Sequence, residues 1–223
     1  MEILLDTAHL EDIRRYHKIY HITGVTSNPT ILAREKGDFF PLLEAIRELI
    51  GHKQLHVQLT GNTSEDMLKE AEAISRKLGK ETYMKVPTNE VGIETMKRLK
   101  EQGYKITATA IYMPQQAMIA ASVGADYVAP YFNRISNMNV EGKNVVSEIA
   151  HLFKLHHCST KILAASFKNT QQIMDALMAG AEAVTATPEL YSQMVENPMI
   201  DAAITGFTAD WEKTYGGKRI FEL

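Results

Sequence analysis

The chain has 223 residues, of which 45% are hydrophobic and 23% charged, with a formal net charge of −3. These values are typical of a folded globular protein with enough chain to bury a core. Because 24 basic and 27 acidic residues nearly balance and no run of five basic residues occurs, the electrostatic footprint of a nucleic-acid-binding protein is missing, whereas a small anionic substrate needs only local positive charge.

Short apolar runs alternate with longer amphipathic segments. In chain order, the predicted strands are Glu2–Asp6, Gly24–Thr26, Leu55–Leu59, Thr82–Val86, Ile106–Ala110, Tyr127–Tyr131, Lys161–Ser166 and Ala183–Thr185. The predicted helices between and after them are His9–Tyr20, Asp38–Ile50, Ser64–Leu78, Glu90–Gln102, Pro114–Val123, Asn144–His156, Thr170–Ala179 and Glu189–Glu196. Eight strand–helix units in about 200 residues fit a closed (β/α)8 TIM barrel better than an open doubly wound sheet. The G-x-G-x-x-G motif of a dinucleotide-binding open sheet does not follow the first strand.

A further helix is predicted after the eighth unit, over residues 199–215. Its apolar residues recur at helical spacing and form one stripe, which consists of Ile200, Ile204, Phe207 and Trp211. Because the barrel is already complete, this stripe must cover another surface, either a neighbouring subunit or the bottom of its own barrel. We expect a single domain over residues 1–223 and a homo-oligomer with this helix at the subunit interface.

The N-terminus and the cysteine content bear on the cellular compartment. The sequence MEILLD enters a strand pattern at once and lacks the basic-then-apolar layout of a signal peptide. No apolar stretch approaches the roughly 18 residues needed to span a bilayer. The one cysteine, Cys158, cannot form a disulfide within the chain, which favours a reducing compartment. We therefore expect a cytoplasmic protein with no membrane partner.

Polar residues gather near the predicted carboxyl ends of the strands. Alternate residues of a barrel strand point inward and outward, and the outward ones pack on the helices. By this alternation Ile3 and Leu5 point outward. The polar residues that fall on the inward side are Asp6, Thr26, Asn28, Gln58, Lys85, Thr109, Tyr131 and Ser166. Since a packed core would have Val, Ile or Leu at most of these positions, the set indicates a polar active site at the C-terminal face of the barrel.

Lys85 is the most informative member of this set. Burial of a charged ammonium is costly, so the barrel interior should lower the pKa of Lys85 from its ordinary value of about 10.4. A partly desolvated amine is the nucleophile that a Schiff-base enzyme needs. A lysine at a strand end can instead extend into solvent, and the strand alone favours that interpretation. The neighbouring inward polar groups reverse the preference.

Five motifs occur in order along the chain: LLDT at the start, GVTSNPT at 24–30, KVP at 85–87, APYFNR at 129–134 and AASFK at 164–168. Together they resemble transaldolase-family motifs over essentially the whole chain. The short length without insertions resembles the fructose-6-phosphate aldolase-like subfamily. The resemblance implies a (β/α)8 barrel, no metal or other cofactor, and a lysine imine with a ketose or dihydroxyacetone unit. It also implies ring assemblies, often stacked pentamers.

The resemblance assigns roles to individual positions in the pocket. Lys85 would be the Schiff-base nucleophile. Asp6 and Asn28 would hold the donor's hydroxyl groups and the imine region, and Asp6 would also offer a carboxylate for proton transfer. Thr26 would line the same pocket.

A second group of positions is similar to the trio that holds a catalytic water in the aldolase branch, namely Gln58, Thr109 and Tyr131. Transaldolases have Glu at position 58, an Asn near Thr107 and commonly Phe at position 131. The resemblance therefore favours an aldolase that reversibly cleaves fructose 6-phosphate to dihydroxyacetone and glyceraldehyde 3-phosphate. The alternatives are a transaldolase, which passes the three-carbon unit to another aldose, and a non-catalytic sugar-phosphate-binding barrel.

A third group, Arg134, Ser166 and Lys168, matches the family's phosphate-binding positions. Ser166 and Lys168 lie between the seventh strand and the N-terminus of its helix, where barrels often bind phosphate. True transaldolases usually have Arg at position 168, and Lys cannot make the same bidentate contact. We expect sugar phosphates and dihydroxyacetone-type donors as substrates, with a weakened phosphate contact at Lys168.

The eight histidines show no metal-ligand spacing such as H-x-H or H-E-x-x-H, so no metal site is expected. His56 takes the inward side, one layer below Gln58. We interpret it as a core histidine whose ring nitrogens are hydrogen-bonded inside the protein.

Overall fold

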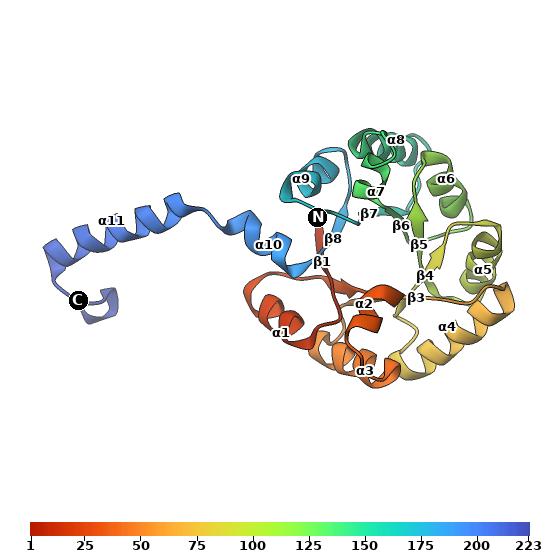
Figure 1. Cartoon of the computed structure of the whole chain (residues 1–223), viewed down its shortest axis with the longest axis horizontal. Helices are drawn as coiled ribbons and strands as arrows, with labels where there is room; N and C mark the ends of the chain where they lie inside the picture. Colours follow the sequence, from red (N-terminus) through yellow and green to blue (C-terminus); the bar gives the residue numbers. More distant parts are fainter.

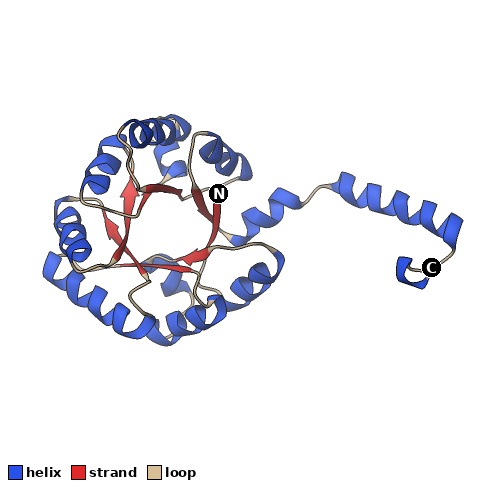
Figure 2. Ribbon diagram, turned by 180° about the vertical axis from the view of Figure 1, so that it is seen from behind, coloured by secondary structure: helices blue, strands red, loops and turns tan.

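A computed structural model describes all residues from 1 to 223 and shows a closed barrel of parallel strands in the order β1 to β8. The strands are β1 (Glu2–Asp6), β2 (Gly24–Thr26), β3 (Gln54–Gln58), β4 (Tyr83–Pro87), β5 (Lys105–Ile111), β6 (Tyr127–Pro130), β7 (Lys161–Ala164) and β8 (Ala183–Ala186). Each strand pairs with the next, and β1 also pairs with β8, which closes the ring (Figure 2). The predicted barrel is confirmed, and the open sheet is excluded.

Helices surround the ring of strands on its outer side (Figure 1). They are α1 (Leu10–Ile19), α3 (Phe39–Ile50), α4 (Ser64–Leu78), α5 (Glu90–Glu101), α6 (Pro114–Ser122), α8 (Gly142–Leu155), α9 (Thr170–Met178) and α10 (Pro188–Val195). All of them were predicted from the sequence, with ends that differ by two residues at most. Their amphipathic patterns place one apolar face of each helix on the barrel.

Two short helices at the C-terminal face were not predicted. They are α2 (Pro29–Arg34) and α7 (Phe132–Ser136), which are too short to show a helical period. The start of α2 has a clear local cause. Asn28 is its N-cap and accepts a hydrogen bond from the Ile31 amide at 3.0 Å, while Pro29 takes the first helical position. The loop after β2 is therefore held in place next to the end of its strand.

The hydrophobic core forms two layers. The larger cluster contains 44 buried residues and lies between the outer side of the barrel and the helices. The smaller one fills the barrel interior and consists of Leu4, Tyr127, Leu163 and Ala183. Each fully buried Leu, Ile or Val side chain contributes about 1.5–3 kcal/mol through the hydrophobic effect. This rigid double layer fixes the strand ends that carry the polar side chains.

The orientation predicted for β7 was wrong. An inward Ser166 requires by alternation an inward Ala164 and an outward Leu163. Instead, Leu163 lies in the inner cluster with Leu4, and Ala164 packs in the outer core. The strand also ends at Ala164 rather than at Ser166. Ser166 has a φ of 65°, in the left-handed region. Its place in the structure is therefore set by this turn of the loop after β7 and not by the strand's alternation.

The layer below the site contains His56. Its Nδ1 lies 2.8 Å from Thr107 Oγ1, its Nε2 lies 3.0 Å from Gln54 Oε1, and its ring stacks on Tyr83 with centroids 4.4 Å apart. Burial lowers the pKa of His56 well below its usual value, so the ring is neutral. The interpretation as a satisfied core histidine is confirmed.

The last helix, α11 (Pro198–Tyr215), extends away from the barrel, and the chain ends after the short helix η1 (Ile220–Glu222) (Figure 1). None of its residues is buried, and Phe207 is 72% exposed. The alternative in which this helix covers the bottom of its own barrel is therefore wrong, because the extended residues Glu196 and Asn197 separate α11 from α10 and α11 leaves the barrel. No helix of the structure is both long enough and apolar enough to cross a membrane.

Candidate active site

The C-terminal face of the barrel holds a cavity of about 500 Å³. Of the ten residues predicted for the site, eight line it: Asp6, Asn28, Gln58, Lys85, Tyr131, Arg134, Ser166 and Lys168. The other two, Thr26 and Thr109, are fully buried and hydrogen-bond to side chains that line the cavity. The structure thus brings the whole predicted set together at one end of the barrel, where enzymes of this architecture have their active sites.

Lys85 lies on β4 and is only 6% exposed. Its Nζ donates a hydrogen bond to the carbonyl oxygen of Ser27 at 2.8 Å. Burial lowers the pKa of Lys85, and the negative charge of Asp6 opposes part of that effect. A larger fraction of Lys85 is therefore present as the free amine near neutral pH than for an ordinary lysine, which is the state that attacks a carbonyl carbon.

Asp6 is the last residue of β1, and its charge interacts with that of Lys85. Burial raises the pKa of Asp6, whereas the charge of Lys85 and a hydrogen bond from Thr26 Oγ1 at 2.7 Å oppose that rise. The side chain lines the cavity together with Lys85. Because burial raises the pKa of Asp6 while Lys85 and Thr26 lower it, this carboxyl group can accept or return a proton during a reaction.

Tyr131 and Thr109 form a hydroxyl pair across from these residues. The two oxygens lie 2.9 Å apart. Burial raises the pKa of Tyr131, although the Thr109 hydroxyl and the charge of Arg134 partly oppose the rise, so the phenol is neutral at neutral pH. Gln58 lines the cavity but does not bond to this pair, and its buried Oε1 accepts from no protein donor. The phenol and this amide oxygen remain able to bind a small polar molecule.

Strand β5 is irregular next to this pair. Its register with β6 shifts between Ala108 and Ile111, and Ala110 has a φ of 58°. A bulge of this kind changes the direction of the side chains beyond it. Left-handed backbone at a residue with a Cβ is costly, and such residues cluster at active sites and ligand-binding sites. Ala110 itself lines the cavity.

Positive charge surrounds the cavity entrance. Arg134 and Lys168 come from α7 and from the loop before α9, and a third cation, Arg34, comes from the end of α2. The Arg134 guanidinium also lies over the Tyr131 ring, 4.9 Å from its centroid. Asp6 is the one carboxylate among the lining residues. The local field therefore favours an anionic substrate, although the net charge of the chain is negative.

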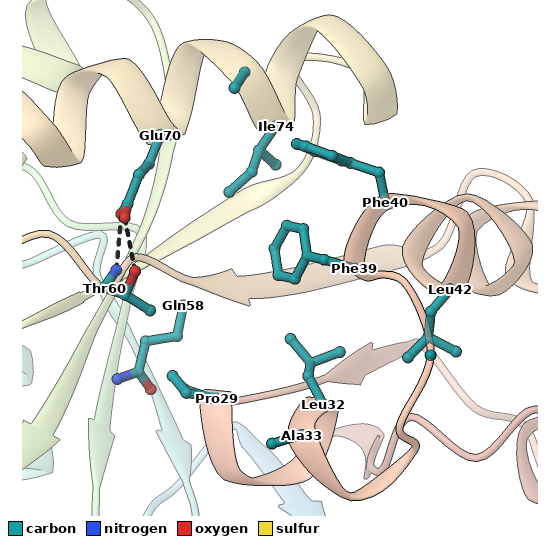
Figure 3. Close-up of a pocket in the computed structure, with 12 residues that line it drawn as sticks. Pro29, Leu32, Ala33, Phe39, Phe40, Leu42, Gln58, Thr60, Glu70 and Ile74 are labelled. Carbon is teal, nitrogen blue, oxygen red and sulfur yellow. Dashed lines mark hydrogen bonds between the residues drawn. The ribbon is translucent and has the colours of Figure 1, made fainter.

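A second, apolar cavity of about 540 Å³ adjoins the first (Figure 3). It shares Pro29 and Gln58 with the polar cavity. The rest of its wall is mainly apolar side chains from α2, α3 and α4, including Leu32, Phe39 and Ile74. It offers few groups for chemistry, so the polar cavity is the candidate active site.

Comparison with known proteins agrees with this geometry. Residues 3–217 match the sequence profile of the family described as transaldolase/fructose-6-phosphate aldolase. The chain belongs to this family. It is also 43% identical, over 213 residues, to a protein of Streptococcus pneumoniae (strain ATCC 700669 / Spain 23F-1) named probable fructose-6-phosphate aldolase. That alignment covers 95% of this chain and 96% of the relative.

As a member of the transaldolase/fructose-6-phosphate aldolase family, the protein is an enzyme of the aldolase or transaldolase type. Three features of its site were missed by the sequence analysis. The Ser27 carbonyl binds Lys85 through the backbone, which no residue type reveals. Arg34 was missed because α2 was not predicted, and Thr185 because it belongs to none of the five motifs. The predicted strand over 183–185 did offer a signal for Thr185, since it ends in a threonine at the cavity end of the barrel.

Proposed function

We propose that this enzyme is a class I aldolase that reversibly cleaves fructose 6-phosphate to dihydroxyacetone and glyceraldehyde 3-phosphate through a Schiff base on Lys85. The observation that carries the proposal is the buried Lys85 amine, whose pKa is lowered by burial and which shares its cavity with Asp6. The name of the pneumococcal relative supports the choice of substrate.

The proposed reaction begins at the ketone carbon, C2. The free amine of Lys85 attacks C2, and loss of one water leaves a protonated imine that withdraws electrons from the adjacent C3–C4 bond. A base takes the proton of the C4 hydroxyl, the C3–C4 bond breaks, and glyceraldehyde 3-phosphate leaves. The electron pair of that bond remains on the enzyme-bound three-carbon unit as an enamine. Asp6 and Asn28 are proposed to hold the hydroxyl groups and the imine region of this unit.

The enamine is then protonated at C3 and the imine is hydrolysed, which releases dihydroxyacetone and the free Lys85. Hydrolysis consumes one water, so the water lost on imine formation is balanced. We propose that Gln58, Thr109 and Tyr131 hold this water. The neutral phenol of Tyr131 can both donate and accept a hydrogen bond, which suits a proton relay.

A transaldolase is the second candidate, because both activities appear in the description of the family. The test is fructose 6-phosphate cleavage with and without erythrose 4-phosphate. We expect the wild-type enzyme to release glyceraldehyde 3-phosphate without an acceptor aldose. A strict requirement for erythrose 4-phosphate would make the enzyme a transaldolase. Absence of both activities, together with no borohydride-trapped adduct of dihydroxyacetone, would leave only a sugar-phosphate-binding barrel.

We propose that Arg134, Ser166 and Lys168 bind the substrate's phosphate and that Arg34 adds to the field at the entrance. We expect Arg34→Gln to raise KM for fructose 6-phosphate roughly two- to fivefold, the range of one solvent-screened charge contact. The KM for dihydroxyacetone in the reverse reaction should not change, because that donor carries no charge. Lys97→Gln removes an exposed charge on α5 and is the matched control. An equal effect of Arg34→Gln on charged and uncharged substrates would contradict this role.

We propose that the chain acts as one domain and assembles into a homo-oligomer, with pentameric rings as the expected form. The exposed stripe of α11 supports this, since Ile204 is 56% and Phe207 72% exposed, and so large an apolar surface is unfavourable in water. A helix that leaves its own barrel can bury the stripe on a neighbouring copy.

Substitution of one stripe residue tests the assembly. We expect Phe207→Glu to reduce the mass measured by light scattering at micromolar concentration, because a carboxylate cannot be buried in an apolar contact without large cost. Ala209→Glu places the same charge on another face of α11 and should leave the assembly intact. A wild-type monomer under these conditions would contradict the proposal.

We further propose that the enzyme acts in the cytoplasm. Support comes from the single, free cysteine, Cys158, which is typical of proteins in a reducing compartment. Fractionation of the cells that produce the enzyme, followed by detection with an antibody, tests this directly.

A further inference from the structure

A row of three hydrogen-bonded side chains crosses three adjacent strands at the wall of the cavity, which Asp6 and Thr185 line. Thr185 on β8 lies next to Thr26 on β2, with their hydroxyl oxygens 2.6 Å apart, and Thr26 in turn donates to Asp6 Oδ1 at 2.7 Å. Strand β1, which carries Asp6, lies between the other two strands. Thr26 is completely buried and Thr185 is 2% exposed. Thr185 therefore reaches the carboxylate through Thr26.

The number of available protons decides which hydroxyl donates in each of these two hydrogen bonds. An ionised carboxylate can only accept hydrogen bonds, and a threonine hydroxyl has one proton to donate. Thr26 gives its proton to Asp6, so it can only accept from Thr185. Thr185 must then donate to Thr26. In a buried row each hydrogen bond polarises the next, so the donation by Thr185 strengthens the bond that Asp6 receives.

We propose that Thr185 is a positioning residue for the reaction: by donating to Thr26, it holds the Thr26 hydroxyl in the orientation that stabilises the ionised Asp6 carboxylate. The inference rests on the proposed function, in which Asp6 holds the imine region and takes part in proton transfer. None of the five sequence motifs contains Thr185.

The consequence is a pH effect with a defined sign. Burial raises the pKa of Asp6, and a hydrogen bond to the ionised form opposes that rise. Loss of the Thr185 hydroxyl weakens the hydrogen bond from Thr26 to the Asp6 carboxylate, so the pKa of Asp6 should rise. The other ionisable groups that sense Asp6 are Lys85 on β4, Tyr131 after β6 and Tyr191 on α10. Burial raises the pKa of both phenols, which stay neutral, so an acid transition reports on the Asp6–Lys85 pair.

The first experiment measures this carboxyl group without any substrate. The full-length protein is labelled with 13C at the aspartate carboxyl carbons, and the Asp6 signal is assigned by its loss in Asp6→Asn. We expect Thr185→Val, which replaces the hydroxyl with a methyl group of similar size, to raise the titration midpoint of Asp6 by about 0.3 to 1 pH unit. Thr26→Val should raise it further, and Thr185→Ser should restore the wild-type value. Thr160→Val is the matched control, since Thr160 is buried and donates to the Ala125 carbonyl away from the cavity.

The second experiment follows kcat/KM for fructose 6-phosphate against pH. We expect the acid limb of Thr185→Val to move up by the same amount, which lowers activity about two- to tenfold on the acid side and leaves the plateau unchanged. An unchanged Asp6 midpoint in Thr185→Val overturns the proposal, and so does an equal loss of activity at every pH that Thr185→Ser does not repair. If the wild-type enzyme cleaves no fructose 6-phosphate, the proposed function fails, while the carboxyl titration still decides the role of Thr185.

Discussion

Replacement of Lys85 by Met should abolish aldol cleavage while leaving the barrel folded. We expect a loss of at least about a thousandfold, because the covalent route disappears with the buried amine and the other lysine that lines the cavity, Lys168, is exposed to solvent. The Lys85 side chain is 6% exposed, and Met fills a similar volume with an unbranched chain. The measurement is steady-state cleavage of fructose 6-phosphate, with a far-UV circular dichroism spectrum to verify the fold.

Two opposing effects decide the stability of the same variant. Removal of the amine relieves the cost of burying an ionisable group, whereas the Ser27 carbonyl loses its hydrogen-bond donor. Each effect amounts to about 1–3 kcal/mol, and about 1 kcal/mol moves the melting temperature by roughly 2–4 °C in a chain of this size. Since they oppose each other, we expect a melting temperature within a few degrees of the wild-type value. A loss of activity could then not be attributed to unfolding.

Borohydride reduction with dihydroxyacetone provides the direct test of the role of Lys85. The wild-type enzyme should gain the mass of the reduced adduct on the peptide that contains Lys85, and Lys85→Met should gain none. Lys168→Met is the matched control, because it removes a lysine from the entrance and should still be trapped with this uncharged donor. An adduct on Lys168 or Lys161, or residual turnover above a few per cent in a folded Lys85→Met enzyme, would contradict the assignment.

The rate at which dihydroxyacetone is trapped on Lys85 should depend on pH in a direction that follows from the burial of the amine. Only the neutral amine attacks the ketone, and burial lowers the pKa of Lys85. The rate of adduct formation should therefore rise with pH and level off below the ordinary lysine value of about 10.4. A rate that continues to rise through pH 10 would mean that the amine is not desolvated in solution.

The barrel could be predicted because the same local sequence pattern, a strand followed by a helix, repeats eight times along the chain. Each strand is a short apolar run and each helix is an amphipathic segment. Because strands and helices alternate strictly, few folds bury both the strands and the apolar faces of the helices. The positions of Asp6 and Lys85 followed from the same patterns, since one-residue alternation fixes which side chains enter the barrel. The resemblance in five motifs then supplied the remaining assignments at the entrance.

The parts that were missed depend on the path of the chain between the regular elements. The helix α2 has six residues, too few to show a period, so Arg34 was not placed at the cavity. Ser166 was assigned by strand alternation, although a left-handed turn sets its position. The proposed role of Thr185 depends on its hydrogen bond to Thr26 on β2, which in turn bonds to Asp6 on β1. These contacts form only when the barrel closes. The direction of α11 depends on the extended residues Glu196 and Asn197 between α10 and α11, where the sequence shows no periodic pattern.

We propose that Tyr131 decides which of the two activities of the family this enzyme performs. We expect Tyr131→Phe to lower the cleavage of fructose 6-phosphate by roughly ten- to a hundredfold, the usual range for one acid–base contact. The phenol is hydrogen-bonded to Thr109 at 2.9 Å and stays neutral, so it can donate to a water and accept from it, whereas Phe can do neither. The steps that suffer are protonation of the enamine and hydrolysis of the imine.

Transfer to an acceptor should respond differently from cleavage in the Tyr131→Phe enzyme. An enamine that is protonated more slowly lives longer and has more time to meet erythrose 4-phosphate. Transfer should therefore be kept, or should rise relative to cleavage. Tyr112→Phe is the matched control, because Tyr112 packs edge-on against Tyr131 with ring centroids 5.8 Å apart and lines the same cavity. It removes a phenol hydroxyl without breaking the Thr109 bond, and the ratio of transfer to cleavage should stay at the wild-type value.

The deciding assay measures both rates on the wild-type enzyme, Tyr131→Phe and Tyr112→Phe. A wild-type enzyme that turns over only with erythrose 4-phosphate is a transaldolase, and the assignment to the aldolase branch is then wrong. Equal loss of both activities in Tyr131→Phe would give Tyr131 a structural or substrate-binding role. The contact of its ring with Arg134, 4.9 Å from centroid to guanidinium carbon, offers such a role through the phosphate site. A rise in KM for phosphorylated substrates, with unchanged KM for dihydroxyacetone, would identify that outcome and remove the water relay from the mechanism.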